Sequence, residues 1–258
     1  MIMGDPVASL LDWFDTNGAD FPWRRTRDRY RVLVAEVMLQ ATQSARVVPF
    51  YERWVARWPD ASALACAPLG EVLAQWHGLG YPRRARNLHH AAVQIAATGW
   101  PANGRLSDLP GVGPYTAAAL RCFADGEAVL PVDTNVRRVL ARRFPGGWPG
   151  TPDGRGWAVG QALMDLGREV CSARSPRCES GCPLRTGCES ADSGLVDDRT
   201  PRSRPQGRYE GSLRQRRGRL LAALAEHGEA PMHDAEAARS LVADGLAGQR
   251  GSCLVRAS

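Results

Sequence analysis

The sequence predicts an all-α protein, and three observations carry that prediction. Apolar residues recur every three or four positions in successive segments of residues 7–143, which is the period of an amphipathic helix. Short turns that contain Gly, Pro or Asp separate these segments. No stretch alternates convincingly between apolar and polar residues at the period of two that a half-buried strand requires.

The helical pattern continues along the chain with one long break. Helices are predicted over the following ranges: Val7–Phe14, Tyr30–Gln43, Arg46–Trp58, Ala61–Trp76, Arg83–Ala97, Ala117–Phe123, Trp157–Val170 and Leu213–Glu226. Residues 191–212 are rich in Ser, Asp, Arg, Pro and Gly, and are predicted to be a linker. The tail, from Pro231 to Ser258, has room for one more helix and a short ribbon.

The composition limits the class of protein. The chain has 258 residues and a net charge of +6, which suits a polyanionic partner such as nucleic acid. No apolar run approaches the length of about 18 residues that a transmembrane helix requires, so no membrane span is predicted. The N-terminus lacks the basic region of a signal peptide, and we expect a cytoplasmic enzyme.

All 33 basic residues are arginine, because the chain contains no lysine. A GC-rich genome would produce the same bias without any functional cause. The chemical consequence holds in either case: no lysine side chain is present to form a Schiff base with a substrate.

A glycine-rich turn precedes one of the predicted helices. Its string is Leu109-Pro110-Gly111-Val112-Gly113-Pro114-Tyr115-Thr116. Two glycines separated by one residue allow a tight turn with outward-facing N–H groups, and the following helix adds its positive N-terminus. A plain helical hairpin would need only the two glycines. The full string favours a site for a DNA phosphate, held without regard to base sequence.

A cluster of cysteines follows the helix that is predicted to end at Val170. Its members, separated by six, three and five residues, are Cys171, Cys178, Cys182 and Cys188. Disulfides are not expected in a cytosolic chain, so the thiolates are interpreted as metal ligands. Four thiolates suit either a [4Fe–4S] cluster or a structural zinc ion. The other cysteines are expected to be small core or surface residues: Cys66, Cys122 and Cys253.

Two carboxylates have contrasting sequence environments. Glu36 has only apolar or uncharged neighbours three and four positions away on its predicted helix. If that face is buried, desolvation raises the pKa of Glu36 and lets it donate a proton near neutrality; an exposed Glu on an amphipathic helix is the equally weighted alternative. Asp133 is expected to cap the helix that carries Val136 and to remain ionised. One protonated and one ionised carboxylate are what glycosidic cleavage needs.

These motifs together resemble a known family. In order along the chain they are Glu36–Gln40, Gly78–Tyr81 with Arg84–Leu88, Leu109–Thr116, Val132–Val139 and the four clustered cysteines. The order and the residues resemble the adenine DNA glycosylases of the helix-hairpin-helix, iron–sulfur superfamily, over about residues 11–188. The resemblance implies a [4Fe–4S] cluster as the cofactor. It implies that the partner is double-stranded DNA with a mispaired or damaged base. The protein would act as a monomer and would not bind a membrane.

The resemblance also implies a division into domains. Residues 25–130 would form a six-helix barrel that contains the helix-hairpin-helix motif. Residues 1–24 and 131–190 would form the cluster domain, with the DNA and the flipped base held in the cleft between the two. After the linker, residues 213–258 would form a small module that is winged-helix-like, without room for the Nudix-like domain with which longer members recognise 8-oxoguanine.

The resemblance implies a role for each site residue by its position in a motif. Glu36 would protonate the leaving adenine, Asp133 would stabilise the oxocarbenium-like sugar, and Tyr115 and Asn135 would assist them. The residues implied in DNA and base binding are Gln40 and Tyr81, which would enter the duplex; Trp23, Arg24 and Gln161, which would line the base pocket; and Gly111, Val112 and Gly113, which would hold a phosphate. The cluster ligands would be Cys171, Cys178, Cys182 and Cys188.

Several departures from the family pattern keep alternatives open. Three residues separate Cys178 from Cys182, whereas members of the family usually have two at this place. Ala19 and Ala41 stand where many members have an Arg and a Gln that contact the DNA. Phe21–Arg24 with Thr26–Asp28, Tyr115 and the missing glutamine at position 41 also resemble the thymine/uracil mismatch glycosylases. A non-catalytic iron–sulfur DNA-binding protein is the alternative from another class, and the presence of both carboxylates argues against it. Because relatives that cut the strand have a lysine in place of Tyr115, we expect a monofunctional glycosylase.

Overall fold

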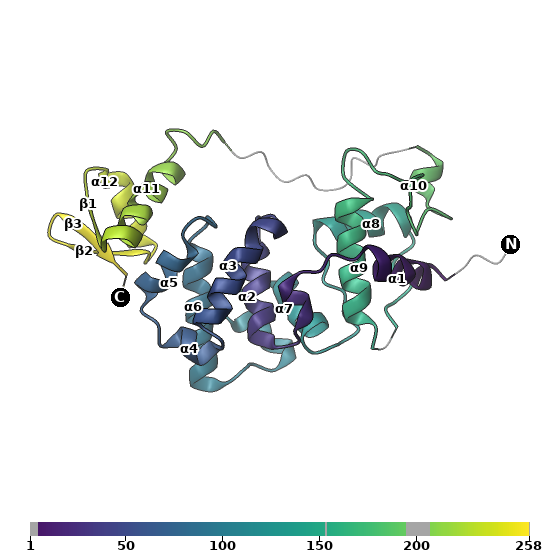
Figure 1. Ribbon diagram of the computed structural model, residues 1–258, viewed down its shortest axis with the longest axis horizontal. Coiled ribbons are helices and arrows are strands. Elements are labelled where there is room, and N and C mark those ends of the chain that lie inside the picture. The colour runs from purple at the N-terminus through teal and green to yellow at the C-terminus, as the bar shows by residue number, and fades with distance from the viewer. Residues whose placement is uncertain (1–4, 153, 195–206, 258) are drawn as a thin grey trace. The chain divides into compact units, whose positions relative to one another are not determined.

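The computed structural model describes residues 5–152, 154–194 and 207–257, and it divides into two compact units. One unit contains residues 1–29 and 114–203, and the other contains residues 30–113 and 204–258. Figure 1 labels their elements, which are helical except for a small sheet in the tail, so the predicted all-α class is confirmed. No helix in the described part of the chain is long and apolar enough to span a bilayer.

The first unit is built from four main helices, together with the short helices η1 (Pro22–Arg25) and α10 (Glu189–Asp192). The main helices are α1 (Pro6–Asn17), α7 (Pro114–Phe123), α8 (Thr134–Arg143) and α9 (Gly156–Glu169). Helix α9 packs against α1, α7 and α8, and is therefore the centre of this unit. Its core joins apolar side chains from α1, α8 and α9, including Leu10, Val136 and Leu163.

The second unit begins with helices that surround an aromatic core. They are α2 (Arg29–Leu39), α3 (Ser44–Arg57), α4 (Ala61–Ala65), α5 (Leu69–Trp76) and α6 (Arg83–Thr98), followed by the short helix η2 (Asn103–Asp108). Trp54 lies edge-on against Trp58 and Trp76, with ring centroids 4.8 and 5.4 Å away. The Trp54 indole donates to the Tyr30 hydroxyl, which donates to the Trp58 carbonyl, so the polar atoms of this core are satisfied.

Two predicted helices differ from those in the structure. The helix predicted over Tyr30–Gln43 ends at Leu39. The helix predicted over Ala61–Trp76 is two helices, because α4 ends at Ala65 and α5 begins after Pro68. Proline cannot donate the backbone hydrogen bond that a continuous helix needs and disfavours the helical conformation of the residue before it, which explains the break.

The tail module, residues 207–257, has the expected extra helix and more strands than expected. Helix α11 (Leu213–His227) is followed by β1 (Glu229–Pro231), α12 (Ala235–Ala243), β2 (Ala247–Arg250) and β3 (Cys253–Arg256). The strands form an antiparallel sheet in the order β1-β3-β2. The predicted linker, residues 191–212, lies mostly outside the described residues, and α11 begins after Ser212, whose side chain accepts from the Gln215 amide.

The tail module packs on α5 of the same unit. Helix α11 lies against α5, and the Gly70 amide donates to the Ala257 carbonyl at 2.9 Å. A Cβ atom added at Gly70 would lie 2.6 Å from the Cβ of Arg256, so only glycine allows this approach. Three arginines also bond to Asp244: Arg83 and Arg217 at its carboxylate and Arg86 at its carbonyl. The tail is therefore an integral part of this unit.

Candidate active site

Glu36 is buried in the second unit. Every residue of α2 from Val32 to Met38 is buried, so the helix has no polar face in this stretch, and Glu36 is only 7% exposed. Of the two alternatives from the sequence, the exposed carboxylate is therefore wrong. The carboxyl group is therefore held away from bulk solvent on the covered part of α2.

Gln40 and Tyr81 lie in the two turns that border α2 and α6. Gln40 is half-buried just after the end of α2. Tyr81 lies just before α6 and is 43% exposed, which is unusual for a large aromatic side chain. The backbone of Tyr81 has φ of +48°, in the left-handed region that non-glycine residues seldom adopt.

The glycine-rich turn from Leu109 to Gly113 presents its backbone at the surface. Leu109 and Val112 are buried and anchor the turn, whereas Gly111 and Gly113 are exposed. Gly111 has φ of +80°, and a Cβ atom there would lie 2.9 Å from the Cβ of Asn87. Glycine is thus required at this position both by the backbone conformation and by the space.

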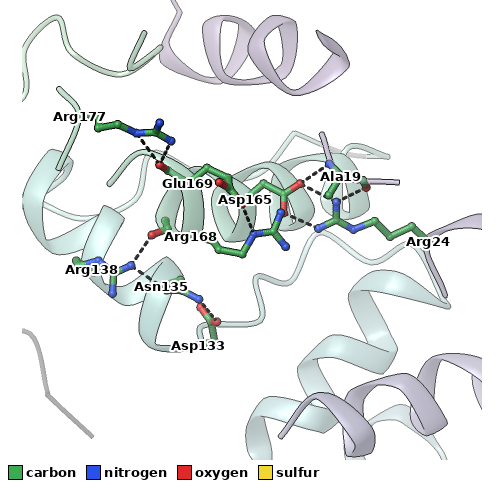
Figure 2. A network of polar contacts seen from close by, with 10 residues as sticks. Ala19, Arg24, Asp133, Asn135, Arg138, Asp165, Arg168, Glu169 and Arg177 are labelled. Atoms are coloured by element: carbon green, nitrogen blue, oxygen red, sulfur yellow. Dashed lines mark hydrogen bonds and ion pairs between the residues drawn. The ribbon is translucent and has the colours of Figure 1, made fainter. Parts of the chain in front are cut away.

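Asp133 caps α8 in the first unit, as expected. Its Oδ1 accepts from the Val136 amide at 2.7 Å and its Oδ2 accepts from the Asn135 side-chain amide at 3.1 Å. Figure 2 shows Asp133 and Asn135 pointing toward one another, with Arg138 next to Asn135 on the side away from Asp133. Asp133 is half-buried, so it is held by fixed N–H donors while one side stays open to solvent.

Arg138 links this pair to the start of the cysteine segment. It is 7% exposed and donates to the Asn135 Oδ1 at 2.8 Å, to the Gly167 carbonyl, and from Nε to the Cys171 carbonyl at 2.6 Å. Helices α8 and α9 are in close contact here, because a Cβ atom added at Gly167 would lie 2.8 Å from the Cβ of Asn135. The orientation of Asn135 thus depends on Arg138 and on the absence of a side chain at Gly167.

Arg24, expected in the base pocket, is bound to a carboxylate that the sequence analysis did not single out. Asp165 of α9 is 1% exposed and accepts from both terminal nitrogens of Arg24 and from the Ala19 amide (Figure 2). Trp23 is buried beside it and stacks on Phe21 at 4.9 Å. These contacts fix the residue 19–24 segment against α9.

Gln161 and Tyr115 complete the predicted site residues of the first unit. Gln161 is 6% exposed and lies four residues before Asp165, on the same face of α9. Tyr115 is half-buried in the first turn of α7. The structure therefore places Trp23, Arg24 and Gln161 around one part of α9, and Asp133 and Asn135 at the start of α8.

The four clustered cysteines line a single cavity of about 120 Å³. Within the described ranges, no three His, Cys, Asp or Glu side chains stand at the spacing of metal ligands. The donor set nevertheless suits a soft metal centre, because four thiols face one space and no other acidic or imidazole ligand lines it. Burial raises the pKa of Cys178, and raises that of Cys182 to about 11, as the neighbouring thiols also do.

Arg142 gives this cavity a buried positive charge. It is 3% exposed and donates to the Cys171 Sγ at 3.4 Å and to the Ser172 and Ala173 carbonyls. Bound metal makes thiols lose their protons, and a nearby cation stabilises the thiolates that result. The residues of this cavity therefore fit an anionic thiolate-ligated group.

Two functional signals were missed in the sequence. The argument that drew attention to Glu36 does not find Asp165, because Arg168 stands three positions away on the same helix and offers an ordinary ion pair. The role of Arg138 could not have been found from the sequence, because its partners lie on α9 and in the cysteine segment, about 30 positions away in the chain.

Comparisons with known proteins identify the family of the chain. Residues 34–151 match the model of the HhH-GPD superfamily of base excision DNA repair proteins. Adenine DNA glycosylase of Mycolicibacterium smegmatis is 44% identical over 234 residues, which cover 83% of this chain and 78% of that protein. The Mycobacterium tuberculosis protein of the same name is 42% identical over 240 residues, covering 84% and 77%.

Solved structures show the same fold. A thermostable thymine-DNA glycosylase has a TM-score of 0.66 at 29% identity, covering 72% of this chain and 95% of that chain. Endonuclease III trapped on DNA has a TM-score of 0.62 at 23% identity, covering 73% and 94%, and supports the fold alone. The two mycobacterial proteins are more than 40% identical to this chain, and the aligned residues cover more than three quarters of each of them. The chain therefore belongs to the adenine DNA glycosylase family.

Proposed function

We propose that the protein hydrolyses the N-glycosidic bond of adenine mispaired with guanine or 8-oxoguanine in duplex DNA, without cutting the strand. One observation carries the proposal: the chain has two carboxylates in opposite environments. Glu36 is buried in an apolar helix, and Asp133 accepts two N–H donors at a helix N-terminus. Glycosidic cleavage needs one carboxyl group that donates a proton and one that stays anionic, and we assign these roles to the buried Glu36 and the helix-capping Asp133.

In the proposed mechanism, Glu36 donates a proton to a ring nitrogen of adenine while the bond from the base to C1′ of the sugar breaks. The bonding electrons leave with the base, and an oxocarbenium-like sugar remains. The Asp133 carboxylate stabilises that positive charge, and Asn135 keeps the carboxylate oriented through its 3.1 Å hydrogen bond. Water then adds to C1′, and its proton returns the acid to its starting state.

The base must leave the stack before this reaction, because its glycosidic bond cannot be reached inside the duplex. We assign the base pocket to Trp23, Arg24 and Gln161, and insertion into the duplex to Gln40 and Tyr81. The turn of Gly111, Val112 and Gly113 presents backbone to the solvent and would hold a phosphate. We expect the enzyme to act on chromosomal DNA in the cytoplasm, as a monomer.

We assign a [4Fe–4S] cluster to Cys171, Cys178, Cys182 and Cys188, which line one cavity. When bound, the cluster cross-links the segment between these cysteines, and so stabilises that part of the first unit. Gly181 has φ of +104° between Cys178 and Cys182, so the backbone can accommodate the extra residue in this gap.

A panel of duplexes tests the substrate. Adenine opposite 8-oxoguanine, adenine opposite guanine, thymine opposite guanine and uracil opposite guanine are compared under single-turnover conditions, on protein checked for absorption near 400 nm. We expect release of adenine from the first two. Preferential release of thymine or uracil would instead favour the mismatch glycosylase that the 29% identical structure suggests.

The non-catalytic alternative is tested with the same duplexes. A protein that only binds DNA needs neither carboxylate, so the Glu36→Gln variant would bind and behave like the wild type. We expect this variant to bind the adenine mismatch but to release no adenine at a measurable rate. Glu52→Gln on α3, where the side chain is exposed, is the control and is expected to keep full activity.

A further inference from the structure

Two turns of the second unit contain a strained backbone. In the part of the chain that the structure describes, Ala41 and Tyr81 are the two non-glycine residues with positive φ, at +53° and +48°. Ala41 follows the end of α2, and Tyr81 precedes the start of α6. A side chain in the left-handed region is unfavourable, and it persists only where surrounding contacts impose it.

One buried arginine contacts both turns. Arg84 lies in the first turn of α6 and is 9% exposed. Its Nη1 donates to three carbonyls at the end of α2, those of Val37, Met38 and Gln40, at 2.9, 3.0 and 2.6 Å. Its Nη2 donates to the carbonyls of Leu79 and Gly80, at 3.1 and 3.0 Å, and to the Thr42 hydroxyl at 3.3 Å.

These contacts explain why α2 ends at Leu39. The last carbonyls of a helix have no partner in the helix, and they carry the negative end of its dipole. The Arg84 guanidinium takes two of these carbonyls and that of Gln40, just beyond the helix end. A planar group with donors on two nitrogens can satisfy two separate chain segments at once, which a lysine ammonium does less well.

The cation is held in place by aromatic rings as well as by carbonyls. The guanidinium carbon lies 5.1 Å from the Trp76 ring centroid and 5.5 Å from that of Tyr81. The Trp76 indole also donates to the Gly80 carbonyl at 2.9 Å. Burial lowers the pKa of Arg84 to about 10, so the side chain stays charged at neutral pH.

We propose that Arg84 is a positioning residue that holds Gln40 and Tyr81 as one pre-formed pair for insertion into the duplex. The proposal rests on the proposed function, which assigns insertion to these two residues. Arg84 imposes both left-handed turns in the free protein, so neither turn has to form when the DNA is opened. Such pre-organisation favours base extrusion and leaves the chemical step unchanged.

We call the contacts of Arg84 with the turns at Ala41 and Tyr81 the Arg84 clamp, and the first test measures this clamp without any substrate. Amide hydrogen exchange is followed in Arg84→Gln and Arg84→Lys at residues 39–43 and 78–81. We expect exchange to become roughly tenfold faster or more in both segments together, since one side chain holds both. Arg83→Gln is the matched control, because its side chain is adjacent, 64% exposed and bonded to Asp244 instead. Faster exchange in only one segment, or equally throughout the unit, would overturn the clamp.

The second test asks whether the clamp acts on insertion. Extrusion is followed by the fluorescence of 2-aminopurine placed as the target base, and adenine release is measured under single-turnover conditions. We expect extrusion and release to fall together in Arg84→Lys, by about 10- to 100-fold, with little change in Arg83→Gln. Normal extrusion with slow release would contradict the positioning role.

The Ala41→Gly substitution is expected to restore base extrusion in the Arg84→Lys variant. A general loss of stability in Arg84→Lys would not be repaired in this way. Glycine adopts positive φ at little cost, so the turn no longer needs to be imposed. We expect Ala41→Gly to restore extrusion about fivefold in the Arg84→Lys background and to change little in the wild type. No recovery would overturn the proposal. If the wild type releases no adenine, the proposed function fails, whereas the exchange and fluorescence results still decide the clamp.

Discussion

The Asp165 carboxylate accepts hydrogen bonds from both terminal nitrogens of Arg24: Nη1 donates to Oδ2 at 2.7 Å and Nη2 donates to Oδ1 at 2.9 Å. The side chains are 1% and 8% exposed, so both charges are shielded from water. The pair ties the segment that carries Trp23 to α9, which carries Gln161. Arg168 also contacts Asp165, at 3.0 Å.

Replacing Asp165 with Asn is therefore expected to destabilise the first unit by about 3–5 kcal/mol, because it leaves the Arg24 charge buried without its counter-ion. Urea unfolding monitored by tryptophan fluorescence measures the loss. The control is Asp108→Asn, which removes an exposed pair with Arg105 and is expected to cost under about 0.5 kcal/mol. Equal effects of the two substitutions would show that burial of the Arg24 pair has no consequence.

Gly167→Ala is expected to destabilise the protein by about 1–3 kcal/mol, because the new methyl group would lie 2.8 Å from the Asn135 Cβ. Displacement of Asn135 should also slow adenine release. Gly218→Ala on α11 is the control: its nearest neighbour is the Tyr209 hydroxyl at 3.6 Å. Alanine in that helix is expected to stabilise by up to about 1 kcal/mol. The same sign for both variants in thermal unfolding would contradict the close contact between α8 and α9.

Asp133→Asn is expected to reduce adenine release by about 10²–10³-fold, since an uncharged amide stabilises the sugar cation poorly. Stability should change little, because Asn is as good an N-cap as Asp. Single-turnover release on adenine–8-oxoguanine duplexes and thermal unfolding give the two values. Asp60→Asn alters another cap, at α4, where the carboxylate accepts from the Ala63 amide at 2.8 Å, and should leave release unchanged. Undiminished release by Asp133→Asn would remove the proposed mechanism.

Cys182→Ser is expected to abolish or strongly reduce the absorption near 400 nm, because this thiol is one of the four that line the cavity. Iron and sulfide contents of the purified protein should fall with the absorption. Cys66→Ser, at an exposed position after α4, is the matched control and should keep the full spectrum. Bound zinc without iron in the wild type would favour a structural zinc site instead.

Borohydride trapping is expected to give no covalent adduct with DNA, since the chain has no lysine to form the Schiff base. Strand breaks should appear only after alkaline treatment of the product. A lysine-dependent glycosylase of the same fold provides the positive control on the same duplex. Efficient trapping with matching strand cleavage would show that another amine performs a lyase step.

The sequence by itself determined the fold class and predicted which residues form the site. Helical period alone predicted the positions of α3, α6, α9 and α11 to within a few residues. The glycine at position 111 was identified as a turn residue from local sequence, and its φ of +80° agrees, whereas its close approach to Asn87 was not visible in the sequence. The break between α4 and α5 was also a local signal, at Pro68, and was overlooked.

Tertiary structure decided which charges are buried and which residues hold the site in place. Helical period left the burial of Glu36 open, because burial depends on which faces of α2 are covered. The end of α2 is set by Arg84, 44 positions from the Gln40 carbonyl, and Arg24 is fixed by Asp165, 141 positions away. Hydrogen bonds and ion pairs act over a few ångströms in space, and a single sequence does not show which distant residues folding brings to that distance.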